Sequence, residues 1–226
     1  MQLSTSIALT LALLPCLGAC NTDDEETRTE VAEAPAAPAA PEAPAPVADA
    51  RAVPAVAAIG QPAPDFLLSD LDGNEVRLSD HFAGTVVLEW FNPGCPFVVR
   101  SHTTGELASW PNEAGVTWYA INSGATGKQG NGVELNRQAR AKWKMKAPIL
   151  LDEDGTVGRA YGAKTTPHMF VIHDGVLVYA GAIDDDVRGD KGDARVNYVK
   201  QALAELAADK PVSVPETKSY GCSVKY

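Results

Sequence analysis

The residues with the clearest chemical potential in this 226-residue chain are its four cysteines, which lie far apart in the sequence. Cys16 and Cys20 are close to the N-terminus, whereas Cys95 and Cys222 lie in the later part of the chain. Four scattered cysteines are too few for a disulfide-knit miniprotein and too widely spaced for a zinc ribbon. Their number and spacing therefore leave a redox or hydrolytic domain open.

Cys95 has the sequence context of a reactive thiol. It follows the apolar, β-branched run 85–91 and precedes Pro96, a residue favoured in the first turn of a helix. We therefore expect Cys95 at a helix N-terminus, where free amide groups and the helix dipole stabilise a thiolate. Cysteines in such positions have lowered pKa values and react as nucleophiles. The alternative is a small buried apolar side chain, but the open turn at Pro93-Gly94 favours reactivity.

The segment around this cysteine resembles a known superfamily. Residues 86–98, VVLEWFNPGCPFV, resemble the strand–loop–helix of thioredoxins, and residues 163–171, AKTTPHMFV, are similar to their second hallmark. That hallmark is a Thr-Pro pair, here Thr166 and Pro167, joined by a cis bond before a central strand. The resemblance implies that this loop lies against Cys95 and pairs its backbone with bound substrate.

Two further segments are similar to the redoxin branch, which contains peroxiredoxins and thiol-specific antioxidant proteins. One is the N-terminal stretch PAPDF at 62–66, and the other is the C-terminal stretch GCSVKY at 221–226. The second is similar to the end of a bacterial group of redoxins that carry a Cys-Pro-Phe motif, here Cys95 to Phe97. The resemblance covers about Ile59 to Tyr226 and implies an antioxidant or disulfide-exchanging protein.

The remaining sequence supplies the elements that must position these residues. Asp72-Gly73 and Asp174-Gly175 predict two hairpins. The strands expected are 65–68, 75–78, 85–91, 116–121, 149–151, 168–173 and 176–180, and the helices are 96–110, 133–144, 156–161 and 194–208. In the last helix, Val196, Val199, Leu203 and Leu206 recur at helical spacing. The order predicts an α/β, thioredoxin-like fold with a central mixed sheet flanked by helices and an N-terminal β-hairpin extension.

Two departures from the family patterns bear on the reaction. Thioredoxins place a second cysteine at the position of Val98, so release of a mixed disulfide by that neighbour is impossible here. Peroxiredoxins place proline and threonine or serine at the positions of Leu88 and Asn92, and the hydroxyl helps to bind peroxide. Asn92 is a candidate substitute for that hydrogen bond. The sequence therefore does not decide between peroxide reduction and thiol–disulfide exchange.

Cys222 is the candidate resolving cysteine. A thiol that has formed a sulfenic acid or a mixed disulfide needs a second thiol for its regeneration. Cys222 follows Gly221 and a tail punctuated by Pro211 and Pro215, so it could reach across the surface to Cys95. A passively packed tail cysteine and a permanent structural disulfide to Cys95 are the alternatives.

Other residues near the expected site are weaker candidates. Thr166 and Pro167 are expected to shape the substrate site, with substrate contacts from Asn92, Gly94, Pro96 and His168. Copper binding by Cys95 and a histidine is disfavoured, because copper chaperones of this fold use a second cysteine close to the first. No metal or other cofactor is expected, and the aspartates between 184 and 193 are expected to form a solvated loop.

The N-terminal residues predict an export signal and a lipid anchor. Residues 1–19 carry no charged side chain, and their apolar stretch 7–17 is too short to span a bilayer. The string Leu17-Gly18-Ala19-Cys20 resembles the lipobox of bacterial lipoproteins, in which the cysteine is lipidated. Asn21 is not the aspartate that retains such proteins at the inner membrane. The resemblance implies a bacterial cell-envelope protein at the periplasmic face of the outer membrane. Ordinary secretion and a buried helix are the alternatives for residues 1–19.

The charge distribution separates a linker from the working domain. The formal net charge is −10, of which −6 lies in residues 21–58, where alanine and proline predominate. Its composition predicts that residues 20–58, which include the lipidated cysteine, form a semi-extended spacer. The redoxin domain is expected at 59–226, and its C-terminal segment is 209–226. An acidic chain of this kind does not favour nucleic acid as a partner.

These observations predict a thiol-dependent oxidoreductase of the extracytoplasmic space. The expected partners are protein disulfides or hydroperoxides as substrates, an external thiol reductant, and the membrane through the lipid on Cys20. The alternative is a non-catalytic redoxin-fold module that binds a client protein or copper, and it predicts that Cys95→Ser leaves the function intact.

Overall fold

The computed structural model describes residues 56–104, 107 and 115–226. The expected signal peptide 1–19, Cys20 and almost all of the linker lie outside the described residues, so their boundaries stay predictions. Within the described part, no helix has both the length and the apolar character that a bilayer crossing requires.

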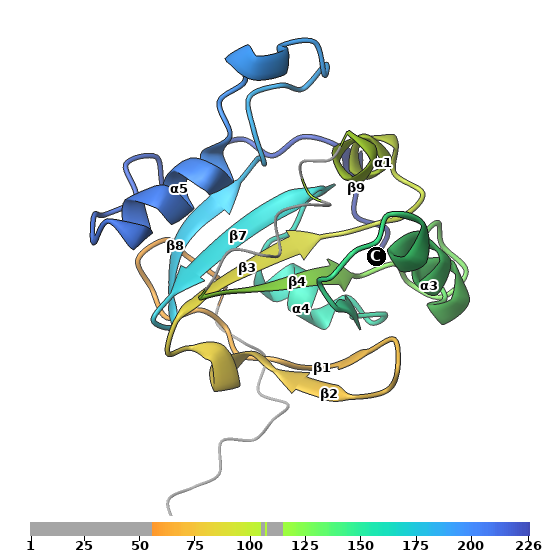
Figure 1. Cartoon of the computed structure of the whole chain (residues 1–226). Coiled ribbons are helices and arrows are strands. Elements are labelled where there is room, and N and C mark those ends of the chain that lie inside the picture. The colour runs from red at the N-terminus through yellow and green to blue at the C-terminus, as the bar shows by residue number, and fades with distance from the viewer. Residues whose placement is uncertain (1–55, 105–106, 108–114) are drawn as a thin grey trace, which may run out of the picture. The chain divides into compact units, whose positions relative to one another are not determined.

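A seven-stranded mixed sheet forms the centre of the domain (Figure 1), with the strand order β2-β1-β5-β4-β3-β7-β8. Its strands are β1 (Leu67–Asp70), β2 (Glu75–Arg77), β3 (Thr85–Trp90), β4 (Val116–Asn122), β5 (Ile149–Leu151), β7 (His168–His173) and β8 (Val176–Gly181). Strand β3 pairs in parallel with β4 and antiparallel with β7. A separate two-stranded pair joins β6 (Thr165–Thr166) to β9 (Cys222–Ser223).

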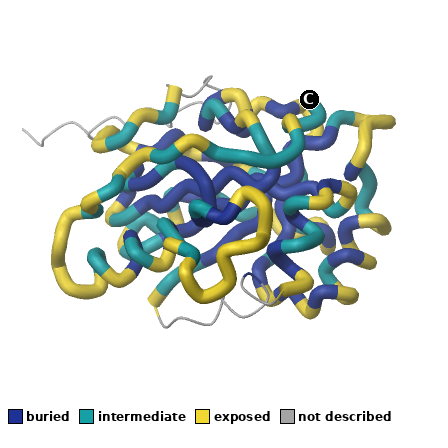
Figure 2. Tube along the Cα trace, turned by 90° about the horizontal axis from the view of Figure 1, so that it is seen from above, coloured by how far each residue is buried: buried dark blue, intermediate teal, exposed yellow. Residues whose placement is uncertain are grey.

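Helices cover both faces of the sheet. They are the 3-10 turns η1 (Leu78–His81) and η2 (Gly192–Ala194) and the helices α1 (Pro96–Thr103), α3 (Val133–Lys142), α4 (Thr156–Ala160) and α5 (Tyr198–Ala207). Val86, Leu88 and Trp90 of β3 share a core with Val157 of α4, whereas Val87 packs with residues of α5. A third cluster joins α1 and α3 around Cys95. Figure 2 accordingly shows buried residues along the strands and exposed ones in the outer loops.

The predicted α/β architecture with a central mixed sheet is confirmed, and both hairpins are present. The start of the last helix was placed too early. Asn197 caps α5 by accepting a hydrogen bond from the amide of Lys200, so the helix begins at Tyr198. Arg195 is extended, and Val196 is 45% exposed and lies outside the helix. Helix α1 ends at Thr103, and most of the expected continuation lies outside the described residues.

The expectation of a solvated loop at 184–193 is wrong for two of its aspartates. Asp184 and Asp186 are buried. The carboxylate of Asp186 accepts hydrogen bonds from the backbone amides of Gly189, Asp190 and Lys191, at 2.8, 2.9 and 3.2 Å. Buried charged groups need hydrogen-bond partners, and this carboxylate finds them in the loop backbone, whose turn it stabilises.

Candidate active site

Cys95 lies at the corner between β3 and α1. It is the N-cap residue of α1, with extended backbone angles, and Pro96 opens the helix. The carbonyl of Asn92 accepts a hydrogen bond from the Cys95 amide at 3.0 Å, and its side-chain oxygen accepts one from the Gly94 amide at 2.8 Å. The turn therefore holds the thiol at the helix N-terminus, as the sequence predicts.

The second hallmark segment and the C-terminal tail meet at this corner. The bond between Thr166 and Pro167 is cis, and Thr166 pairs directly with Cys222 across β6 and β9. The sulfur of Cys95 lies 2.9 Å from the carbonyl oxygen of Thr166 and 2.8 Å from the sulfur of Cys222. Both cysteines are free thiols. The structure thus brings together four residues that the sequence nominated from three distant segments.

The environments of the two thiols move their pKa values in opposite directions. Burial by itself raises the pKa of Cys95, but hydrogen bonding with the Cys222 thiol and with Thr166 lowers it below the ordinary value. The hydroxyl of Thr166 is buried and has no hydrogen-bond partner among the described residues. Burial and the hydrogen bond to Cys95 raise the pKa of Cys222 to about 11. Cys95 is therefore the more acidic thiol of the pair, and Cys222 keeps its proton to higher pH.

Cys95 is fully buried, with 0% of its surface exposed, while Cys222 is partly exposed. A groove of about 1030 Å³ lies beside the tail, between residues 56–59, Thr165, His168 and residues 216–219. Neither sulfur lines this groove. An external substrate therefore does not reach Cys95 through it, and the residues that cover the thiol must move first.

Asn92 and a partner from a distant loop hold the turn. The side-chain amide of Asn92 donates to the carbonyl of Gln129 at 3.1 Å, and the Gln129 side chain donates back to the carbonyl of Gly94 at 3.1 Å. Both polar ends of the Asn92 side chain are thus engaged within the protein. Gly94 and Pro96 are exposed at the rim of the site. The sequence favours a position near the site for the glycine-rich loop that contains Gln129, but it gives no signal for these particular hydrogen bonds.

His168 follows Pro167, but its ring belongs to the other side of the sheet. It packs on Phe170, with ring centroids 4.4 Å apart, and Phe170 lies in the core that contains α4. Cys95 packs in the cluster of α1 and α3 instead. Burial and the charge of Lys164 lower the pKa of His168 to about 4, and its Nδ1 accepts the Lys164 amide. His168 is therefore a neutral structural acceptor at neutral pH.

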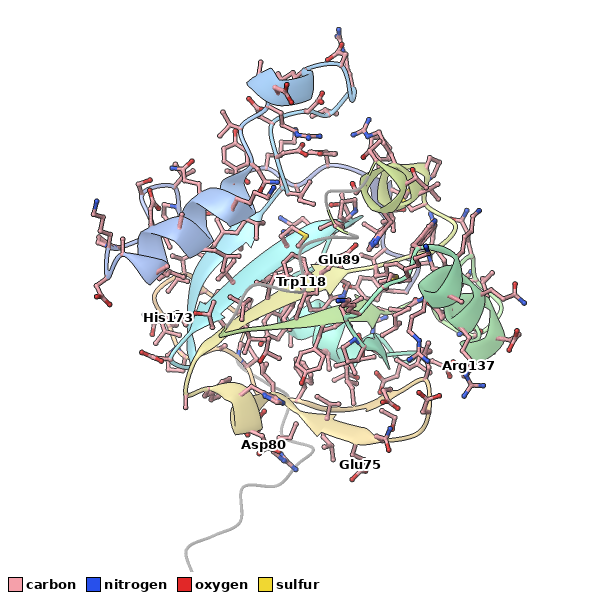
Figure 3. All side chains as sticks on the ribbon, viewed as in Figure 1. Glu75, Asp80, Glu89, Trp118, Arg137 and His173 are labelled. Carbon is pink, nitrogen blue, oxygen red and sulfur yellow. The ribbon has the colours of Figure 1, made fainter. Side chains whose placement is uncertain are left out.

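A buried pair of polar side chains lies under α1. Glu89, labelled on β3 in Figure 3, lies with its Oε1 3.0 Å from Nε2 of His102, and both side chains are almost fully buried. The ring of His102 stacks on Trp143 with centroids 5.1 Å apart. The sequence signal for this pair is a single acid within an apolar strand. His102 is therefore a buried structural partner of Glu89.

The tail is anchored at its last residue. The ring of Tyr226 lies 4.6 Å from the guanidinium carbon of Arg159, and its hydroxyl donates to the carbonyl of Ala163 at 2.8 Å. A Cβ at Gly155 or Gly158 would lie 2.5 or 2.6 Å from this tyrosine. Two glycines thus make room for the ring, a relationship that the sequence did not reveal.

The sequence disfavours copper binding because it has no second cysteine near Cys95 along the chain, but the fold brings the sulfur of Cys222 to 2.8 Å from that of Cys95. In the part of the chain that the structure describes, no group of three or more histidine, cysteine or acidic side chains is arranged to hold a metal ion.

The sheet, its flanking helices and the thiol at the strand–helix corner define a thioredoxin-like fold. The Redoxin family model matches residues 58–198, and the chain belongs to the Redoxin family. A solved structure of an uncharacterized conserved protein from Geobacillus kaustophilus is 32% identical, with a TM-score of 0.67, covering 75% of this chain and 92% of that one. A hypothetical protein from Sinorhizobium meliloti is 27% identical, with a TM-score of 0.65, covering 75% of this chain and 94% of that one.

A curated relative carries a functional name. The thiol-disulfide oxidoreductase ResA of Geobacillus thermodenitrificans is 33% identical over 117 residues, which are 51% of this chain. The match spans 63% of the length of that relative.

Proposed function

We propose that this protein is a thiol–disulfide oxidoreductase in which Cys95 attacks the substrate and Cys222 resolves the intermediate. The observation that carries the proposal is the pair of free sulfurs 2.8 Å apart, with the pKa of Cys95 lowered and that of Cys222 raised. When the pKa values of two neighbouring thiols differ in this way, the thiol with the lower pKa acts as the nucleophile and the other one keeps its proton.

The reaction proceeds through two exchanges. The Cys95 thiolate attacks one sulfur of a substrate disulfide, so that a mixed disulfide forms and the other substrate sulfur leaves as a thiolate that takes up a proton. Cys222 then loses its proton and attacks the Cys95 sulfur. A Cys95–Cys222 disulfide forms, and the second substrate thiol leaves. The substrate gains two electrons, and an external dithiol returns the protein to its reduced form.

Two observations favour disulfide exchange over peroxide reduction. The curated relative is named a thiol-disulfide oxidoreductase. The side chain of Asn92, which stands where peroxiredoxins place the peroxide-binding hydroxyl, is engaged with Gly94 and Gln129. Protein disulfides are therefore the proposed substrates. Peroxide reduction would use the same thiols, with a sulfenic acid on Cys95 in place of the mixed disulfide.

The location of this activity is proposed from the N-terminal sequence. The signal at 1–19, the lipidated Cys20 and the acidic Ala/Pro-rich linker would place the domain outside the cytoplasm, tethered to a membrane of the bacterial envelope. Such a tether keeps the domain close to exported proteins, whose cysteines form disulfides in oxidising compartments.

The test compares three reactions of the reduced protein, followed by the change in tryptophan fluorescence in a stopped-flow instrument. A peptide disulfide, hydrogen peroxide and copper(I) are offered in turn, with Cys95→Ser as the control. Fast reaction with the disulfide that disappears in Cys95→Ser supports the proposal. Fast reaction with peroxide alone would assign a peroxidase instead. Slow reaction with both, together with tight copper binding, would leave the non-catalytic alternative.

A further inference from the structure

We propose that the last six residues of the C-terminal segment, 221–226 (from here on the tail), occupy the strand position of the substrate. Tail and substrate would then compete for one edge of β6. This inference rests on the proposed function of Cys95. It identifies the substrate as an extended polypeptide that carries a cysteine. It also makes departure of the tail a step of the reaction, because Cys95 has no exposed surface while the tail is in place.

The first support is the backbone pairing. Strand β9 runs antiparallel to β6, with Cys222 opposite Thr166 and Ser223 opposite Thr165, and the amide of Val224 donates to the carbonyl of Lys164. This is strand addition to a free edge, a common mode of recognising extended peptides. Because side chains alternate along a strand, a polypeptide in the same register presents its cysteine at the place of Cys222.

The second support is the fit of Gly221 against the loop. A Cβ at Gly221 would lie 2.1 Å from the carbonyl oxygen of Thr166, and the residue has a φ of 135°. The backbone of the tail therefore touches the loop without an intervening side chain. This contact places the Cys222 sulfur beside Cys95, as a substrate sulfur must be placed.

The third support is that the tail pairs with β6 over a short strand whose side chains are not fully buried. Strand β9 comprises only two residues, and its side chains are exposed or half-buried. The rest of the tail is secured by the packing of the partly buried Val224 against the core, by the hydrogen bond from the Ala125 amide to the Lys225 carbonyl, and by the ring and hydroxyl of Tyr226. Segments with few buried contacts open locally at low free-energy cost. The tail can therefore leave β6 while the sheet stays folded.

Competition for one edge couples resolution to release. While the substrate strand is paired with β6, Cys222 is held away from the mixed disulfide. When the tail returns, its backbone displaces the backbone of the substrate, and Cys222 attacks Cys95 in the register seen here. The bond between Cys95 and the substrate sulfur breaks as the Cys95–Cys222 bond forms. The substrate thiolate takes up a proton and leaves with its strand already detached.

The test loosens the tail without altering the nucleophile. Cys222→Ser is compared with Cys222→Ser/Tyr226→Ala, and Cys222→Ser/Lys218→Ala is the matched control at an exposed residue before the tail. Two rates are measured for Cys95. One is alkylation by iodoacetamide, and the other is cleavage of a mixed disulfide between thionitrobenzoate and a short uncharged peptide. Circular dichroism verifies that each variant is folded.

Loss of the tyrosine anchor should accelerate both reactions about tenfold or more, since it removes a hydrogen bond and a cation–π contact from the closed state. The Lys218→Ala control should react as its parent does. A synthetic tail peptide with serine in place of cysteine should then inhibit the peptide reaction of the Tyr226→Ala variant competitively.

The outcomes separate the two proposals. Unchanged alkylation in the Tyr226→Ala variant would overturn the inference, whatever the disulfide chemistry. Faster alkylation without inhibition by the tail peptide would also overturn it, since the tail would then cover Cys95 without sharing the site of the substrate. Faster alkylation and no reaction with any disulfide would support the covering tail and contradict the proposed function.

Discussion

Cys222 lies opposite Thr166 in the antiparallel pair of β6 and β9, and the carbonyl oxygen of the same threonine lies 2.9 Å from the sulfur of Cys95. Thr166 thus fixes the tail through its backbone pairing and contacts the sulfur of Cys95 through its carbonyl group. The 2.8 Å separation of the two sulfurs follows from the register of this short pair. Disturbing the register should therefore alter the chemistry without any change to either cysteine.

The first prediction concerns the titration of Cys95. Because the pKa of Cys95 is lowered from the ordinary cysteine value of 9.0, its thiolate persists to a lower pH than that of an ordinary cysteine. Cys222→Ala removes a hydrogen-bond donor and should raise the pKa of Cys95, whereas Cys222→Ser keeps a donor and should leave it low. The ultraviolet absorbance of the thiolate, followed against pH, measures both midpoints. Identical midpoints in the two variants would show that Cys222 does not stabilise the thiolate.

The second prediction concerns Gly221. In Gly221→Ala the new methyl group meets the Thr166 carbonyl, so the tail must shift. Formation of the Cys95–Cys222 disulfide in a glutathione redox buffer should slow about tenfold or more, the effect of losing roughly 1.4 kcal/mol of tail pairing. Gly60→Ala is the matched control, because Gly60 also has a positive φ but faces open space. Equal rates in the two variants would exclude the close approach as the cause.

The third prediction concerns His168 and acid stability. Its pKa is about 4 in the folded protein against an ordinary 6.5, so protons bind more readily to the unfolded chain. The stability contributed by the neutral ring is complete above pH 6.5 and is lost as pH falls toward 4. The loss amounts to about 3 kcal/mol in the free energy of unfolding. Urea unfolding at several pH values should show this fall in the free energy of unfolding between pH 6.5 and 4 for the wild type but not for His168→Asn. The same fall in His168→Asn would assign the effect to other groups.

The fourth prediction concerns the buried pair under α1. His102→Leu leaves the Glu89 carboxyl buried without its partner, which should lower the free energy of unfolding by about 3–5 kcal/mol. The double variant Glu89→Leu/His102→Leu removes both polar groups and should be clearly more stable than the single variant. Denaturant titrations of the wild type, Glu89→Leu, His102→Leu and the double variant complete the cycle. Additive losses would mean that the two side chains are not coupled.

Local patterns allowed much of the fold to be predicted from the sequence. The apolar run before Cys95, the proline after it and the two Asp-Gly turns each report on neighbouring residues. The starts of β4 at Val116 and of α3 at Val133 were predicted correctly, because these boundaries also depend on neighbouring residues. The start of α5 was misplaced because the apolar spacing extends back to Val196, whereas the side chain of Asn197 caps the helix.

Contacts between distant segments could not be predicted in this way. The sequence leaves open whether Cys222 resolves Cys95, forms a permanent disulfide with it or packs passively, because a tail that contains Pro211 and Pro215 has no periodicity that fixes its path. The space that the Tyr226 ring occupies depends on Gly155 and Gly158, which lie about seventy residues away in the sequence. The partnership of Gln129 with Gly94 depends on a loop that no local pattern describes. Only Glu89 gave a visible signal, as an acid in a buried strand that required a partner.

The most direct measurement of the central claim is a map of the disulfides formed after one equivalent of a peptide disulfide is added to the reduced protein. The wild type should release the peptide as a free thiol and contain a Cys95–Cys222 disulfide. Cys222→Ser should stall with the peptide attached to Cys95. Attachment of the peptide to Cys222, or a wild-type protein that keeps the peptide on Cys95, would contradict the assignment of nucleophile and resolving thiol.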